Sequence, residues 1–136
     1  MKYAPALILS VLAFIVITGC ATTEQKIDGF SNGFYAGFAI ERISLFESHT
    51  VAEMNSRKAA AYKKYKSGES FAPNTQGTGG TFDSFDNGYR SGTVLVLQII
   101  GEINEATKKG DQPTPLTDER LLKELNKRLK VYLRDN

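Results

Sequence analysis

Residues 28–37, which read Asp28-Gly-Phe-Ser-Asn-Gly-Phe-Tyr-Ala-Gly37, decide the fold, because they return 55 positions later as Asp83-Ser-Phe-Asp-Asn-Gly-Tyr-Arg-Ser-Gly92. Five of the ten positions are identical, and Phe34/Tyr89 and Ala36/Ser91 are conservative pairs. Chance similarity between two helix starts is the alternative, since Asp caps and glycine are common there. An internal duplication predicts that the two segments have the same structural role, packing against each other or against one partner.

Both copies place glycines one helical turn apart. A glycine inside a helix costs about 1 kcal/mol relative to alanine, and a close approach between two helix backbones is the usual gain from this spacing. Charged residues such as Asp28 and Arg90 argue against a location inside a bilayer. We therefore expect a helix contact within the domain, or else a face for a partner helix or a membrane-embedded protein, at Gly33, Gly37, Gly88 and Gly92.

Three helical segments extend outward from the repeat. The first covers residues 28–66, where aromatic residues recur every four positions at Phe30, Phe34 and Phe38, and it bends or splits near residues 48–50. The second covers residues 84–109 and stops at Gly110. The third begins after Thr117 and carries a stripe of leucines. No segment alternates with a period of two, so strands are not expected.

A Gly/Ser/Thr-rich loop at about residues 67–82 separates the first two helices, and we expect it to be flexible, without a packed core of its own. The fold class predicted from these segments is all-α, a small antiparallel helical bundle. One domain is expected, covering residues 28–136.

The N-terminus has the features of an export signal. Met1-Lys2 supplies a positive start, and residues 4–17 form an apolar run that is too short to span a bilayer of about 30 Å. The run ends in Ile17-Thr-Gly-Cys20, which resembles the lipobox of bacterial lipoproteins. An ordinary signal peptide with a chance cysteine is the alternative.

The resemblance implies that the signal peptide, residues 1–19, is removed and that Cys20 carries a diacylglyceryl group and an N-acyl chain. Two or three acyl chains hold a protein on a membrane almost permanently. Ala21 is not the Asp that favours inner-membrane retention in enteric bacteria, so the resemblance implies the outer membrane, on its periplasmic or surface face. Residues 20–27 are expected to form a lipidated tether.

Composition excludes several classes of function. Lys and Arg number 17 against 15 Asp and Glu, whereas a dedicated nucleic-acid binder would show a strong basic excess. With its one cysteine lipidated, the chain has no disulfide, thiol nucleophile or Cys-rich zinc site. His49 is alone, and no carboxylate pair or phosphate-binding loop stands out. We expect no enzyme activity, no metal, no small-molecule substrate, and no cofactor apart from the covalent lipid.

A basic stretch interleaved with tyrosines ends the first helix. It is either a solvated face or a contact for anionic headgroups of lipid or lipopolysaccharide. Its cations are Arg57, Lys58, Lys63, Lys64 and Lys66.

Size, the lipobox and the glycine-bearing helix starts together resemble the small lipoproteins with which plasmids exclude incoming DNA. Their toxin-immunity counterparts are the first alternative, and a structural lipoprotein that maintains the envelope is the second. An enzyme using acidic residues is a further possibility, without an identifiable group of residues. In each non-enzymatic case we expect another envelope protein as the partner.

Overall fold

The structure is a computed structural model that describes residues 20–44, 50–75 and 77–136. Helices account for all regular secondary structure in these ranges, which confirms the all-α fold class. None of the helices in the described ranges is both long and apolar enough to cross a bilayer.

The first helix, α2 (Thr23–Ser44), begins earlier than the sequence predicted. Thr22 and Gln25 form a reciprocal cap: the Gln25 amide donates to the Thr22 hydroxyl at 3.2 Å, and the Thr22 amide donates to the Gln25 side chain at 2.9 Å. Residues 23–27 of the expected tether, residues 20–27, are therefore helical. Only Ala21 and Thr22 separate Cys20 from the helix.

The remaining helices are α3 (Val51–Lys66), α4 (Phe82–Lys109) and α5 (Asp118–Asp135). Each begins after a threonine whose hydroxyl accepts a backbone N–H in the first turn. Gly110 ends α4 in the left-handed conformation, as its position after two lysines predicted. The long first helix is thus two helices, and residues 45–49, including His49, lie outside the described residues.

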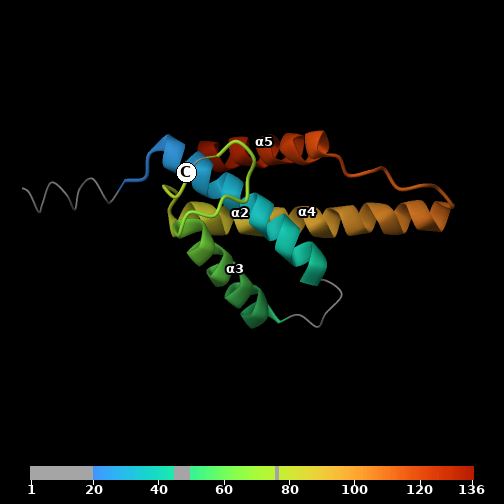
Figure 1. Cartoon of the computed structure of the whole chain (residues 1–136). Helices are drawn as coiled ribbons and strands as arrows, with labels where there is room; N and C mark the ends of the chain where they lie inside the picture. Colours follow the sequence, from blue (N-terminus) through green and yellow to red (C-terminus); the bar gives the residue numbers. More distant parts are fainter. Residues whose placement is uncertain (1–19, 45–49, 76) are drawn as a thin grey trace, which may run out of the picture.

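The helices are arranged around a central crossing of α2 and α4, with α3 and α5 on opposite sides of that pair (Figure 1). Neighbours in sequence run antiparallel, whereas α2 and α4 run in the same direction, because α3 and the following loop return the chain to the end where α2 began. The predicted small bundle with antiparallel neighbours therefore has a parallel pair, α2 and α4, at its centre.

Two hydrophobic clusters flank this crossing. One joins α2, α4 and α5 through Phe30, Phe34, Phe38, Leu95, Val96, Leu125 and Tyr132. The other joins α2, α3 and α4 through Ala36, Ala61, Tyr65, Phe85 and Tyr89. The phenylalanine stripe of the first repeat therefore faces one cluster, and the aromatic residues of the second repeat face the other.

The loop between α3 and α4 is packed, contrary to expectation. Ala72 and Gly80 are buried, and Phe71 packs against the second hydrophobic cluster. The loop lies along the first turns of α2, and its backbone amides donate hydrogen bonds to side chains of α2 and α3.

Candidate functional site

The four repeat glycines lie where α2 and α4 cross. A Cβ added to Gly33 would overlap the carbonyl oxygen of Phe85, and one added to Gly88 would overlap that of Phe30. These two contacts are equivalent under the repeat. The backbones approach so closely that only a glycine fits, and a carbonyl oxygen beside a glycine Cα is the arrangement that favours Cα–H···O contacts.

The second pair of glycines repeats the pattern one turn further along. A Cβ on Gly37 would overlap the carbonyl oxygen of Tyr89, and one on Gly92 would overlap that of Phe34. Reciprocal contact, in which one copy touches the other through the same residues in both directions, is the property of a two-fold interface. The α2–α4 pair is therefore a pseudo-two-fold contact inside one chain.

The other identical positions of the repeat share the same symmetry. Tyr65 of α3 stacks on Phe85 with ring centroids 5.3 Å apart, and Tyr132 of α5 stacks on Phe30 at 4.9 Å. The Tyr65 hydroxyl donates to the Asp28 carboxylate. Asp83 holds the corresponding place, because it adds to the effect of burial in raising the pKa of Tyr132.

Burial and the Asp28 carboxylate raise the pKa of Tyr65 well above its ordinary value of 10.0. Tyr65 also accepts the Gly80 amide at 2.8 Å, so one phenol joins α3, α2 and the end of the loop.

Asn32 and Asn87 complete the five identical pairs. Each donates its side-chain amide to the carbonyl four residues earlier, Asn32 to Asp28 at 2.9 Å and Asn87 to Asp83 at 2.8 Å. Asn32 is fully buried, and its side-chain oxygen also accepts the backbone amides of Phe71 at 2.8 Å and Ala72 at 3.1 Å. Asn32 therefore holds the loop onto α2.

A buried polar cluster joins α2, α3 and α4 at the other end of the second hydrophobic cluster. Arg57 donates two hydrogen bonds of 2.8 Å to Glu41, and the Tyr89 hydroxyl donates to the same carboxylate at 2.8 Å. The bond to Glu41 is the main cause that raises the pKa of Arg57, while burial followed by Glu41 raises that of Tyr89. These interactions hold three helices in register.

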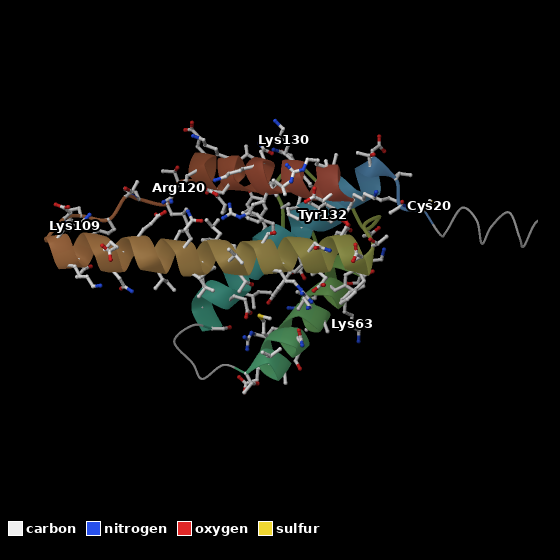
Figure 2. All side chains as sticks on the ribbon, turned by 180° about the vertical axis from the view of Figure 1, so that it is seen from behind. Cys20, Lys63, Lys109, Arg120, Lys130 and Tyr132 are labelled. Carbon is white, nitrogen blue, oxygen red and sulfur yellow. The ribbon has the colours of Figure 1, made fainter. Side chains whose placement is uncertain are left out.

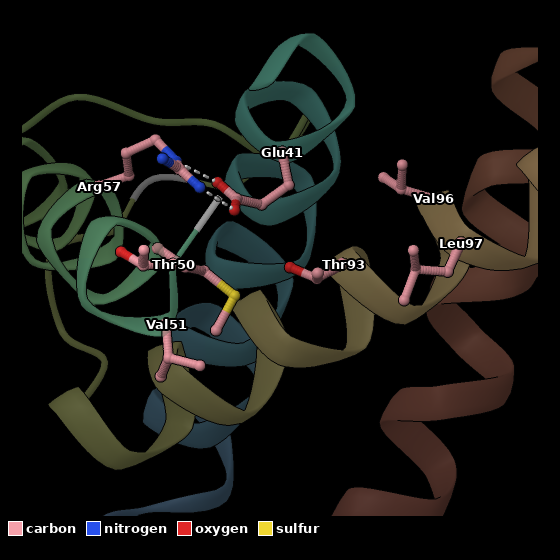
Figure 3. Close-up of a pocket in the computed structure, with 8 residues that line it drawn as sticks. Glu41, Thr50, Val51, Arg57, Thr93, Val96 and Leu97 are labelled. Carbon is pink, nitrogen blue, oxygen red and sulfur yellow. Dashed lines mark hydrogen bonds and ion pairs between the residues drawn. The ribbon is translucent and has the colours of Figure 1, made fainter. Parts of the chain in front are cut away.

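This cluster forms the polar end of a small hollow of about 200 Å³ (Figure 3). Val51, Met54, Val96 and Leu97 supply apolar walls, and Val51 is 72% exposed at the rim. Because the Glu41 carboxylate already accepts Arg57 and Tyr89, its geometry is that of a structural ion pair.

Cys20 is exposed at one end of the molecule, and Lys109 lies at the other (Figure 2). The end of α5 returns to the start of α2, where Lys26 donates to the backbone carbonyl of Asn136 at 2.6 Å.

The five expected headgroup cations are not equivalent. Arg57 pairs with Glu41, and Lys58, only 5% exposed, pairs with Asp86 at 2.5 Å. These two side chains connect helices and do not form an outer basic face. Lys66 is exposed but donates to the carbonyls of Thr78 and Gly80. Lys63 and Lys64 remain as exposed cations of this stretch.

Sequence reasoning missed the tyrosines Tyr65 and Tyr132, the ion pair of Glu41 with Arg57, and the role of Asn32. The repeat could have identified Asn32, because an asparagine at the same place in both copies, Asn32 and Asn87, indicates an equivalent contact in each. The tyrosines lie outside the ten repeated positions, so only the three-dimensional arrangement relates them.

No protein-family model, no curated protein and no solved structure matches the chain. Among the described residues, no three His, Cys, Asp or Glu side chains gather closely enough to hold a metal ion.

Proposed function

We propose that the chain is a non-enzymatic lipoprotein of the bacterial outer membrane whose helical domain acts as an interaction or barrier module that excludes incoming plasmid DNA. The observation that carries this proposal is the sequence Ile17-Thr-Gly-Cys20, in which the exposed cysteine is separated by only two residues from a helix that packs in the core. Two extended residues span about 7 Å. The link would hold the domain close to the membrane surface.

The position of Cys20 also sets how the domain would be presented. The end of the molecule that carries Cys20 would face the lipid, and the end near Lys109 would point away (Figure 2). Lys63 and Lys64 would contribute attraction to anionic headgroups of about 1 kcal/mol each. The partner would then be another protein of the envelope.

Lipid attachment is tested by labelling cells with radioactive palmitate. The wild-type chain should be labelled, and Cys20→Ser should lose the label and accumulate as an unprocessed or mislocalised precursor. Asn126→Ser, which changes an exposed side chain on α5, serves as the control and should be labelled normally. Labelled mature Cys20→Ser protein would overturn the assignment.

Exclusion is tested separately, by expressing the chain in recipient cells and measuring plasmid uptake. We expect reduced uptake that depends on Cys20, because a barrier acts only where it is anchored. Unchanged uptake together with protection against a toxin would favour the immunity role. Unchanged uptake and survival would leave the structural envelope role ahead.

A further inference from the structure

The two halves of the pseudo-two-fold differ in what covers the repeated asparagine. In the first half, the buried Asn32 receives two successive backbone amides from the loop, those of Phe71 and Ala72. The loop thereby covers the outer side of α2 with a segment that bends at Ala72 and turns at Pro73 and Asn74.

The same loop segment also contributes an aromatic side chain. The Phe71 ring lies 6.5 Å from the ring of Phe85, measured between centroids, at the edge of the second hydrophobic cluster. A segment held this way offers two features together: consecutive N–H donors for an asparagine, and a large apolar group for the phenylalanine of the opposite repeat.

In the second half, the equivalent place is an open hollow of about 340 Å³. Its lining includes Asn87, Phe30 and Tyr132, the counterparts of Asn32, Phe85 and Tyr65, together with Ser91 and Val131. Asn87 donates to the Asp83 carbonyl just as Asn32 donates to Asp28. Within the described part of the chain, no group donates a hydrogen bond to the side-chain oxygen of Asn87.

We propose that this hollow binds a bent segment of a partner polypeptide in the way that the first half binds its own loop. Two successive backbone N–H groups of the partner would donate to the Asn87 oxygen, and a large apolar side chain between them would pack against Phe30 and Val131. The hollow would be the contact surface of the proposed interaction module. The biological role of this binding rests on the proposed function. Binding itself does not depend on the lipid.

The rim of the hollow indicates the charge of the partner segment. Lys127 is exposed there, while the neighbouring Arg128 is already paired with Glu124 and Gln98. The one acidic side chain that lines the hollow, Asp135, is paired with Arg134. In the first half, Glu69 precedes the segment that Asn32 holds. A partner segment with an acidic residue before its aromatic residue matches both features.

The test uses a synthetic peptide copying residues 67–75 as the probe and the isotope-labelled full chain in detergent as the receptor. Titration followed by NMR should give saturable shifts at Asn87, Ser91 and Val131. Replacing the phenylalanine of the probe by alanine should weaken binding about tenfold, because the buried apolar contact is lost.

Two variants of the receptor test the site. Asn87→Leu removes the acceptor and should weaken binding of the probe about tenfold. Ser91→Leu leaves the acceptor in place and fills the hollow, and should weaken binding to the same degree. Asn126→Leu, on the exposed side of α5, is the control and should bind as the wild type does. Circular dichroism of each variant confirms that the helices remain.

Three results would overturn the proposal: no saturable shift up to the solubility limit of the probe, shifts confined to Asn32 and Phe85, or equal affinity in Asn87→Leu and wild type. A wild-type dimer that Asn87→Leu disrupts would show that the loop of a second copy is the occupant and not a foreign partner. Loss of palmitate label in wild-type cells would remove the proposed function and leave this binding result standing.

Discussion

At the scale of single residues, the repeat is explained by contacts made twice. Asp, Phe, Asn and two Gly recur because each copy makes an equivalent contact. The glycines contact the other repeat across the α2–α4 crossing, the phenylalanine stacks on a tyrosine of α3 or α5, and the asparagine donates to its own helix. Glycine is the costly member, since each one weakens its own helix by about 1 kcal/mol. The close approach of two backbones offsets this cost.

Alanine at a glycine of the α2–α4 crossing should change the free energy of unfolding in the opposite direction from alanine at a glycine with open space around it. Gly33→Ala and Gly88→Ala should each lower the free energy of unfolding by about 1–3 kcal/mol, because the new Cβ meets a backbone carbonyl. Gly101 in α4 has open space around it, so Gly101→Ala should raise that free energy by about 1 kcal/mol. Urea unfolding measures all three, and stabilisation by Gly33→Ala would contradict the close approach.

The buried tyrosines give the stability a dependence on high pH. Folding raises the pKa of Tyr65 and Tyr89 above 10.0, so the unfolded chain loses these protons first as pH rises. Their contribution is therefore fully present below about pH 10 and declines above it by about 1.4 kcal/mol per pH unit for each tyrosine. Tyr65→Phe should reduce the slope of unfolding free energy against pH above pH 10. An unchanged slope would show that Tyr65 ionises freely in the folded protein.

At the scale of elements, sequence patterns located the ends of α4 and α5 well, because threonine caps and Gly110 act locally. The start of α2 was missed, although Thr22 and Gln25 have the spacing of a reciprocal cap. The loop was misjudged for another reason. Its Gly, Ser and Thr content describes the isolated segment, whereas Asn32 and Tyr65, far away in sequence, fix it in place.

The attachment of the loop predicts unequal effects at two equivalent asparagines. Asn32→Ala removes the acceptor of two buried amides and should cost about 2–3 kcal/mol in free energy of unfolding. Asn87→Ala removes one intrahelical bond and should cost less than about 1 kcal/mol. Hydrogen exchange at Phe71 and Ala72 should accelerate in the first variant and stay unchanged in the second. Equal acceleration in both would contradict the role of Asn32.

At the scale of the whole molecule, two similar halves pack around the crossing of α2 and α4. Helix α3 covers one side of this crossing and α5 covers the other (Figure 1). The fold class followed from helical periodicity, but the parallel direction of α2 and α4 did not, since it depends on where the loop returns the chain. Of the candidate site residues, the four repeat glycines all lie in the contact between α2 and α4. Arg57 and Lys58 were assigned to the surface because helical spacing alone does not reveal the acidic partners Glu41 and Asp86.

The central claim is that the repeated segments contact each other reciprocally through their glycines. Nuclear Overhauser effects between the Gly33 α-protons and Phe85, and between the Gly88 α-protons and Phe30, measure both contacts in one experiment on the labelled full chain. The account predicts strong effects of similar size for the two pairs, because the same atoms meet twice. One pair without the other, or neither, would contradict the pseudo-two-fold crossing.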